Sequence, residues 1–336
     1  MVIECKMVPS QKNLMEQVKA ILKERGQKAI ELAKVTMLQE PIEFKPLREA
    51  MHYFMEEVWY DASHPTLLSL ACEAVGGNPD STTRVGAAVV LLAGGADVHD
   101  DIIDQSISKD STETVFGKFG ENTTILIGDA LLFRGLLMLH EACESLQKEQ
   151  KQEILRLVKD AFFEIGNAEA REASLRGKLE LSPDEYLNII KMKISVAEAS
   201  ARMGAVLGKG TTEEIEGLGH YGKTLGLLMT LRDEFIDVFE VNELSNRFKN
   251  ECLPLPVLYA FQDPCIKKEV VQLLEREITK VEMDRILDLV INAPEVRKLG
   301  KKMHLLVKET IQNLQVERKR DVLVLLLEST LQDLPC

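Results

Sequence analysis

Residues 85–104 read VGAAVVLLAGGADVHDDIID, an apolar run that ends in carboxylates. The i, i+3, i+4, i+7 spacing would place four of them on one helical face: Asp97, Asp100, Asp101 and Asp104. Like charges at this spacing repel by roughly 0.2–0.5 kcal/mol per pair on an exposed helix, and by more on a desolvated one. The stretch therefore predicts a core helix whose acidic end needs a positive partner.

The rest of the 336-residue sequence is also typical of long helices. Its 11 prolines are sparse, with none in residues 80–182 or 184–253, and no alternation of period two appears. These features predict an all-α chain. Because no linker separates two cores, we expect one domain, 1–336. Polar composition predicts loops at 106–122 and 240–256. Helical periodicity covers 11–37, 47–57, 65–75, 82–105, 122–146, 151–175, 183–207, 211–240 and further segments within 256–331.

Charge and cysteine content restrict the partners and the compartment. The net charge is −13, with no basic stripe of the kind that tracks phosphodiester backbones, so we expect no nucleic-acid partner. Six scattered cysteines without a CxxC motif, and an N-terminus without an apolar signal segment, predict a cytoplasmic location. The longest apolar runs, 85–96 and 322–327, are too short to cross a bilayer, so we expect at most peripheral membrane contact.

A second acidic motif lies in LGLLMTLRDEFIDVFE, residues 225–240. Asp233 and Asp237 form another i, i+4 pair on an apolar helix, with Glu234 beside them. Two such pairs on separate helices can face each other. Carboxylate-rich sites with open positions suit Mg²⁺, which keeps waters and bridges to substrate phosphates. The two motifs together predict a magnesium site.

In these motifs the chain resembles the trans-polyprenyl diphosphate synthases, the family of geranylgeranyl and farnesyl diphosphate synthases. Two DDxxD-type motifs in order, with GDALL between them and YGxxLG before the second, make the resemblance specific. It runs from about residue 47 to 256 and implies an isoprenoid synthase fold, a bundle of about ten or more helices around a central apolar cavity. The matching stretches are HDDIID (99–104), FGENTTILIGDALL (119–132), KMKISVAEASARMGAVLG (191–208) and YGKTLGLLMTLRDEFID (221–237).

The resemblance also implies roles for particular residues. Three Mg²⁺ ions held between the two motifs would bind the diphosphate of an allylic prenyl substrate. The implied catalytic residues are Asp100, Asp101, Asp104, Asp233 and Asp237. The implied metal ligands are Asp100, Asp104, Asp233, Asp237 and Glu234. Lys193, Lys109 and Arg232 would bind the diphosphate. Lys193 occupies the family's Lys-Thr motif with Ile194 in place of threonine, and taken alone it would be a surface lysine.

The resemblance implies a chain-length pocket just before the first motif. The fifth and fourth residues before Asp100 are Gly95 and Ala96, so the floor of the pocket is open. Leu92 lies about one turn deeper, roughly 5.4 Å along the helix, which predicts room for roughly twenty carbons or more. Alternatively, the glycines let two helices pack closely. We expect His99 to be a hydrogen-bonded core histidine.

The departures from the family concern the second substrate, isopentenyl diphosphate. The family binds it through basic residues before the first motif, whereas here no Lys or Arg occurs between Arg48 and Arg84, and Ala93 replaces a family histidine. Three hypotheses follow. The chain is a prenyltransferase with an altered acceptor site, acting as a homodimer or as a heterodimer with another prenyl synthase subunit. Alternatively, it is a class I terpene synthase or lyase. The third hypothesis is a non-catalytic regulatory subunit of a heteromeric synthase.

Overall fold

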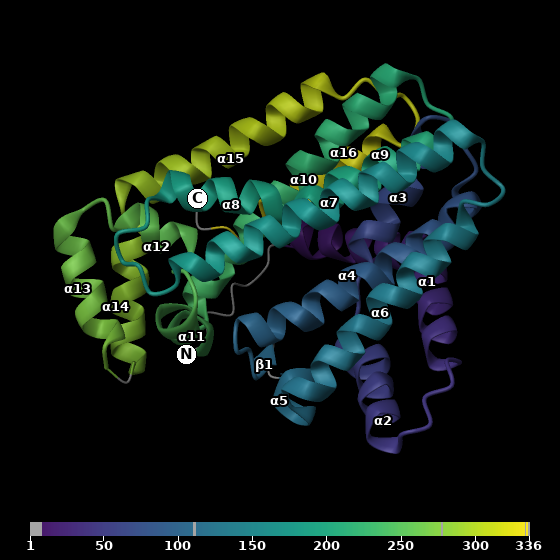
Figure 1. The fold of residues 1–336 in the computed structure, drawn as a ribbon. Helices are drawn as coiled ribbons and strands as arrows, with labels where there is room; N and C mark the ends of the chain where they lie inside the picture. The colour runs from purple at the N-terminus through teal and green to yellow at the C-terminus, as the bar shows by residue number, and fades with distance from the viewer. Residues whose placement is uncertain (1–8, 110–111, 277, 333, 335–336) are drawn as a thin grey trace.

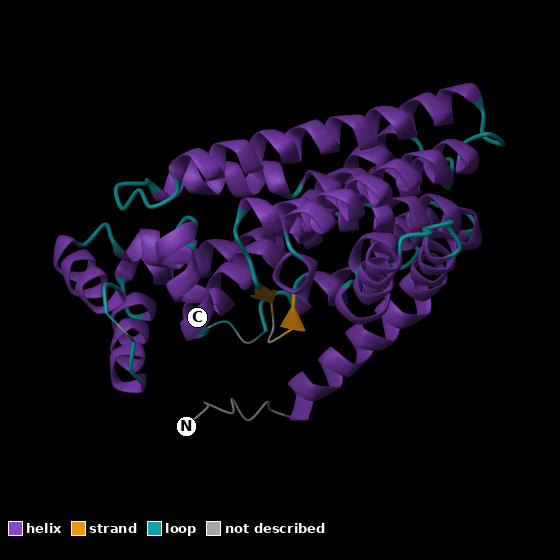
Figure 2. Cartoon of the chain, turned by 60° about the horizontal axis from the view of Figure 1, so that its bottom comes forward, coloured by secondary structure: helices purple, strands orange, loops and turns teal. Residues whose placement is uncertain are grey.

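The computed structural model describes residues 9–109, 112–276, 278–332 and 334. Nearly all of these residues are helical (Figure 2), which confirms the all-α prediction. Within the described ranges, one antiparallel pair of two-residue strands is the only sheet: β1 (Ser108–Lys109) with β2 (Thr112–Glu113). The N-terminal half comprises α1 (Pro9–Leu38), α2 (Lys45–Tyr53), π-helix η1 (Phe54–Val58), α3 (Ser63–Ala74), 3₁₀ helix η2 (Pro79–Thr82), α4 (Thr83–Ile103), α5 (Val115–Phe119), α6 (Glu121–Ala142) and α7 (Lys148–Leu175). The C-terminal half comprises α8 (Pro183–Lys193), α9 (Ser195–Leu207), α10 (Thr212–Phe239), α11 (Val241–Asn250), α12 (Leu255–Ala260), α13 (Pro264–Leu274), α14 (Lys280–Ile291), α15 (Pro294–Asn313) and α16 (Arg320–Ser329).

Helix α4 runs through the middle of the molecule (Figure 1). It packs along α6 on one side, and α1 and α3 also contact it. The long helix α7 passes over α4 and packs against α8 and α9, and α9 in turn packs against α10. The apolar half of α4 is almost entirely buried, for example at Val85, Val90 and Leu91. The predicted core helix is therefore confirmed, and its acidic end points toward the side where α8 and α11 lie.

Helix α8 begins as the sequence indicates but ends earlier. The Ser182 hydroxyl accepts a hydrogen bond from the Glu185 amide, so Ser182 caps the helix. The prediction of one helix over 183–207 was wrong, because the chain leaves the helical conformation at Ile194. The Ile194 side chain packs against Gly226 of α10, and the Ser195 hydroxyl donates to the Ala161 carbonyl of α7 at 3.3 Å. Tertiary contacts thus override the local pattern and leave Lys193 at the end of α8.

Both predicted loops contain regular structure. The 106–122 segment forms the β1–β2 hairpin and α5, which Thr114 caps. The 240–256 segment begins with α11, whose buried face carries Leu244 and Arg247. The sequence prediction was wrong for α11 because only one buried aliphatic residue marks its inner face. The sequence pattern of such a polar helix resembles that of a loop, because the charged face of the helix finds its partners only in the folded protein.

Helix α6 is the one helix in the described ranges that is long and apolar enough to cross a bilayer by length and composition alone. It carries four charged residues, so it is not one of the uninterrupted apolar runs noted in the sequence. About 39% of its most apolar window is buried in the structure, against α4 and its neighbours. Its outward face exposes large apolar side chains, including Leu126, Phe133 and Leu136.

Candidate functional site

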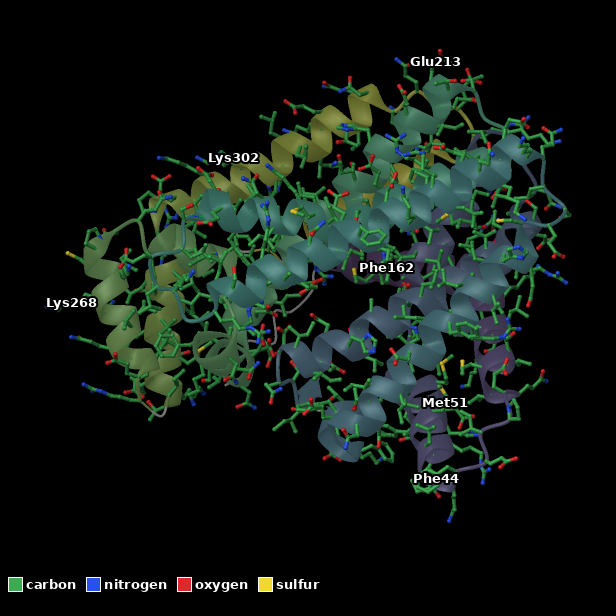
Figure 3. All side chains as sticks on the ribbon, in the orientation of Figure 1. Phe44, Met51, Phe162, Glu213, Lys268 and Lys302 are labelled. Carbon is green, nitrogen blue, oxygen red and sulfur yellow. The ribbon has the colours of Figure 1, made fainter. Side chains whose placement is uncertain are left out.

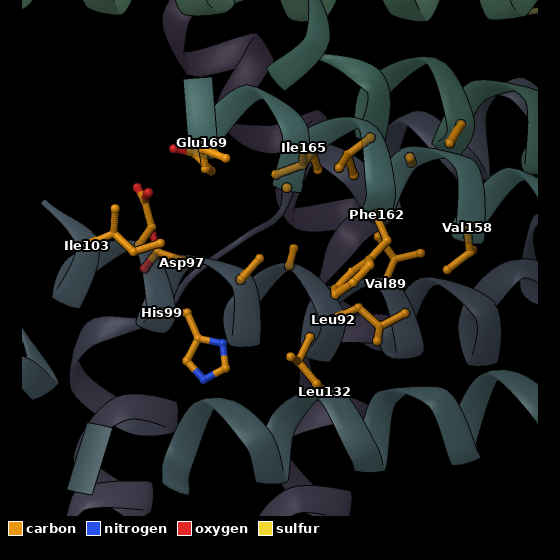
Figure 4. A pocket seen from close by; sticks show the side chains of 18 of the residues that line it. Val89, Leu92, Asp97, His99, Ile103, Leu132, Val158, Phe162, Ile165 and Glu169 are labelled. Carbon is orange, nitrogen blue, oxygen red and sulfur yellow. The ribbon is translucent and has the colours of Figure 1, made fainter. Parts of the chain in front are cut away.

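A cavity of about 560 Å³ lies between α4 and α7, with α6 and α9 completing its wall. Figure 4 shows that its two ends differ in chemistry. Asp97 of α4 and Glu169 of α7 lie at one end, while Phe162 and Val158 of α7 lie at the other. The cavity therefore has an acidic mouth and an apolar interior, an arrangement suited to a ligand that has one polar end and one apolar end.

Two of the three residues predicted for the chain-length pocket lie on this wall. Leu92 and Ala96 line the cavity, one turn apart on α4. Gly95 instead faces α6, where a Cβ would lie 2.8 Å from Leu132 Cγ and 3.0 Å from the Gly128 carbonyl oxygen. The structure corrects the prediction for Gly95, because this glycine allows α4 and α6 to pack closely.

The first acidic motif divides between the cavity and the opposite side of α4. Asp100 lines the cavity, and its Oδ1 is buried without a hydrogen-bond partner among the described residues. Burial and the nearby Glu169 carboxylate together raise the pKa of Asp100 to about 7, against the opposing effects of Lys193 and Lys109. Asp101 is buried away from the cavity and pairs with Lys109 at 2.7 Å. Asp104 caps the C-terminus of α4 and pairs with Arg176 at 2.5 Å.

The second acidic motif is partly built into the fold. Asp237 pairs with Arg247 of α11 at 2.5 Å, and burial raises its pKa to about 7 in spite of the arginine. Glu234 is 6% exposed. One of its oxygens accepts from Arg247 and Tyr186, and the other accepts from the Leu255 amide at 2.6 Å. Both oxygens are engaged within the protein, so the structure corrects the prediction that Glu234 binds a metal. Asp233 is exposed on the same helix.

Polar side chains of α7, α8 and α11 form a chain of contacts that leads to the second motif. The Tyr186 hydroxyl donates to Glu172 of α7 at 3.0 Å and accepts from Arg247 at 2.7 Å. Lys193 binds Glu172 and also lies 3.1 Å from Glu169. Although burial alone would lower the pKa of Lys193, Glu172 and Glu169 raise it above its ordinary value. The chain from Lys193 through Glu172 and Tyr186 to Arg247 thus ends at the Asp237 carboxylate.

Three further residues from the sequence analysis are Lys109, Arg232 and His99. Lys109 of β1 pairs with Asp97 and Asp101, which neutralises part of the acidic face of α4. Arg232 is half-buried on α10 and engaged in an interaction of its own. The ring of His99 lies 3.4 Å from the Ile125 carbonyl oxygen and 3.4 Å from an Asp129 carboxylate oxygen, and the side chain also lines the cavity.

Several functional candidates were missed in the sequence. They are Glu169, Glu172, Arg176, Tyr186, Arg247 and Glu251. Glu169 and Glu172 are spaced i, i+3 on α7, the spacing that drew attention to the other two motifs, and this signal could have found them. Arg247 gave no such signal, because it lies in the segment that was predicted as a loop. Burial raises the pKa of Glu251 to about 8, and the negative charge of Asp104 contributes to the increase.

The carboxylates fit a divalent cation that shares its ligands with a substrate. No three His, Cys, Asp or Glu side chains in the described ranges are close enough to form a complete metal site by themselves. Asp100 nevertheless presents a buried oxygen without a hydrogen bond, and burial raises the pKa values of Asp100, Asp104 and Asp237. A cation would relieve the cost of these buried charges. Mg²⁺ binds in this way, through one or two carboxylates, waters and phosphate oxygens.

Known proteins share both sequence and fold with this chain. Residues 61–290 match the polyprenyl synthetase family profile. The short chain isoprenyl diphosphate synthase of Methanothermobacter thermautotrophicus is 31% identical over 180 residues, which cover 53% of this chain and 54% of that protein. Geranylgeranyl pyrophosphate synthase 11 of Arabidopsis thaliana is 31% identical over 217 residues, covering 60% and 58%. The chain thus spans a little more than half the length of these relatives.

Solved structures extend the likeness of the fold to almost the whole chain. Geranylgeranyl pyrophosphate synthetase from Pyrococcus horikoshii superposes with a TM-score of 0.84 at 22% identity, covering 95% of this chain and 99% of that one. Polyprenyl synthetase from Streptomyces coelicolor gives a TM-score of 0.80 at 20% identity, covering 93% and 99%. The helices around the cavity are those of an isoprenoid synthase, and with more than half of its residues matched by the family profile, the chain belongs to the polyprenyl synthetase family.

Proposed function

We propose that this chain is a Mg²⁺-dependent prenyltransferase-family enzyme that binds and ionises a long allylic prenyl diphosphate. The observation that carries the proposal is the cavity, which has carboxylates at one end and an apolar interior between α4 and α7. A prenyl diphosphate has the matching form, with an anionic head and a hydrocarbon tail. The curated relatives, named as isoprenyl and geranylgeranyl diphosphate synthases, support the same substrate class.

In this proposal, carboxylates from both motifs would hold Mg²⁺ at the acidic mouth of the cavity. They are Asp100, Asp104, Asp233 and Asp237. Mg²⁺ held by these carboxylates would supply the positive charge that a diphosphate leaving group needs when the carbon–oxygen bond breaks and its electron pair stays with the diphosphate. Lys193 lies among the mouth carboxylates and would bind the departing diphosphate once they hold the metal. The apolar wall around Leu92 and Ala96 would exclude water from the allylic cation.

In this proposal, the site for the acceptor substrate, isopentenyl diphosphate, differs from that of the family. Between Arg48 and Arg84 the only side chains that can carry a positive charge are two histidines, and each has an acidic neighbour. His64 lies 2.7 Å from Asp61, and His52 lies 3.4 Å from Glu56. Each lost charge-assisted hydrogen bond is worth roughly 1.5–3 kcal/mol, so the isolated chain should bind isopentenyl diphosphate poorly. A homodimeric or heterodimeric partner would have to supply the missing groups.

Other features of the chain support proposals about its domain organisation, its oligomeric state and its cellular compartment. The buried apolar residues form two clusters, and Leu22 and Ile215 each pack against both of them. We therefore propose that the chain acts as one domain. The outward apolar face of α6 supports a partner subunit. A reducing cytosol agrees with the four cysteines in the described ranges, which are all free thiols.

The test is ligand binding followed by product analysis. Geranylgeranyl diphosphate with Mg²⁺ should raise the melting temperature of the wild-type protein. Asp100→Ala and Asp237→Ala should abolish that increase, whereas Asp284→Ala on the exposed face of α14 should keep it. Mass spectrometry would then identify products formed with and without isopentenyl diphosphate. Equal stabilisation of all three variants would overturn the metal assignment, and efficient elongation by the isolated protein would overturn the altered acceptor site.

A further inference from the structure

A basic groove lies far from the acidic motifs, where the end of α14 meets α15. The groove has a volume of about 820 Å³, and its lining includes Asn292, Arg297, Lys301, His304 and Lys308. We call these five residues the α15 groove. No acidic side chain belongs to its lining. This is unexpected in a chain whose net charge is −13, and the sequence analysis did not identify it as a basic stripe.

Helical geometry creates the stripe. Residues 297, 301, 304 and 308 follow the i, i+4, i+7, i+11 spacing, so they share one face of α15 over roughly 16 Å. The opposite face of the helix is fixed to the core through Leu299, Met303 and Val307, which are all buried. The basic side chains therefore point outward together and cannot turn away without unpacking α15.

The cations of the groove are available to a ligand. Lys301 and Lys308 have no ion pair or hydrogen bond within the described ranges. Lys298, on the edge of the stripe, differs because Glu295 binds it at 2.6 Å. An anion could therefore bind these two ammonium groups without breaking an existing ion pair.

The other two side chains of the stripe are oriented by the protein. Arg297 donates one N–H to the Asn292 side-chain oxygen at 2.6 Å, which leaves the rest of its guanidinium free. His304 donates from Nδ1 to the Gly300 carbonyl at 3.0 Å, which fixes the ring and leaves Nε2 available. A guanidinium held in place beside two ammonium groups matches an anion that has several oxygens.

We propose that the α15 groove binds a phosphate-bearing anion, either a soluble diphosphate or the headgroup of an anionic lipid. Both sources present several negatively charged oxygens to the stripe. Leu305, 55% exposed beside the basic residues, would contact a lipid surface but not a soluble ligand. Nucleic acid is disfavoured, because the stripe is short and the whole chain repels a polyanion. The proposal concerns a second site and does not depend on the function assigned to the cavity.

The experiment compares two probes without Mg²⁺, so that a metal-dependent site cannot bind them. The first is phosphatidylcholine vesicles with or without phosphatidylglycerol, measured by co-sedimentation, and the second is inorganic diphosphate, measured by calorimetry. The test variant is Lys301→Glu/Lys308→Glu. The control variant, Lys268→Glu/Lys302→Glu, changes the net charge equally at exposed positions outside the groove, both labelled in Figure 3.

The wild-type protein and the control variant should bind at least one probe, and the test variant should bind it at least about 10-fold more weakly. Binding to phosphatidylglycerol vesicles alone would identify a lipid headgroup, and binding to diphosphate alone would identify a soluble ligand. Equal weakening in both variants would overturn the proposal, because general electrostatics would then explain the binding. Binding of neither probe by the wild-type protein would overturn it as well.

Discussion

The two acidic motifs have similar sequences but differ in their surroundings. In the first motif, Asp100 presents a buried oxygen to the cavity without a hydrogen bond, and Arg176 is the one arginine that pairs with the motif among the described residues. In the second motif, the fully enclosed Arg247 holds Asp237 and Glu234 together. The first motif is therefore open to a ligand, while part of the second belongs to the structure of the protein. The i, i+4 spacing alone does not separate these two cases.

The difference follows from how each helix ends. Helix α4 stops at Ile103, and its capping residue Asp104 pairs with Arg176, while Asp100, one turn earlier, keeps an oxygen open to the cavity. Helix α10 ends at Phe239, and the chain immediately folds back as α11, which brings Arg247 onto Asp237. Each helix end therefore gives its last carboxylate an arginine partner, but only Arg247 also holds a second carboxylate of its motif, Glu234.

The largest expected effect distinguishes the two arginines. Arg247→Met should lower the free energy of unfolding by roughly 3–5 kcal/mol, because it leaves Glu234 and Asp237 buried without their cation. Arg176→Met, at the partly exposed pair with Asp104, should cost about 1 kcal/mol or less. Urea denaturation of both variants measures the difference. Similar losses would mean that the two motifs are equally structural.

Removal of the Tyr186 hydroxyl should have a smaller effect on the free energy of unfolding. Tyr186→Phe removes the group that joins Glu172, Glu234 and Arg247, and it should cost roughly 1–3 kcal/mol because buried partners lose a hydrogen bond. Tyr259→Phe is the matched control, since the hydroxyl of this buried tyrosine makes no hydrogen bond in the described ranges. Thermal denaturation compares the two variants. A greater loss in the control would show that the bridge contributes little.

Two neighbouring positions on α4 sharpen the comparison at the cavity. Ala96→Tyr should weaken binding of a twenty-carbon prenyl diphosphate by roughly 10-fold or more relative to shorter ones, because each methylene kept from burial is worth about 0.8 kcal/mol. Gly95→Ala should instead cost roughly 1–3 kcal/mol of stability through overpacking against α6, with the length preference unchanged. Competition binding with prenyl diphosphates of graded length measures both. The assignment fails if only the Gly95 variant changes the preference.

The raised pKa of Asp100 should also make the stability of the protein depend on pH. Burial raises the pKa of Asp100 to about 7, so the folded protein holds a proton that the unfolded chain has already released. Stability should then fall as pH rises from about 4 to about 7, by at most ~1.4 kcal/mol per pH unit for this group. Asp100→Asn should flatten the decline in urea denaturation without Mg²⁺. A wild-type stability that rises over this range would contradict the raised pKa.

The sequence predicted the long helices and the two motifs because both depend on local spacing. The periodicity of residues 82–105 and 211–240 predicted α4 and α10 to within two residues at each end. Local spacing could not predict contacts between residues that are distant in the sequence and meet only in the folded protein. The helix over 241–250 has little apolar content, and Arg247 finds its acidic partners only when α11 folds back. Likewise, the direction in which Gly95 faces depends on the position of α6.

The buried chain of charges from Lys193 to Asp237 also affects how this sequence can evolve. Glu172, Tyr186 and Arg247 come from three helices, and losing one member removes a hydrogen bond or an ion pair from its neighbours in the interior. Because such a loss costs from roughly 1–3 kcal/mol for the hydroxyl to roughly 3–5 kcal/mol for the arginine, these positions should change together or not at all. The apolar cavity wall is different, since volume-conserving substitutions there usually cost less than about 1.5 kcal/mol. Preference for the hydrocarbon tail can therefore drift through single substitutions while the polar framework stays fixed.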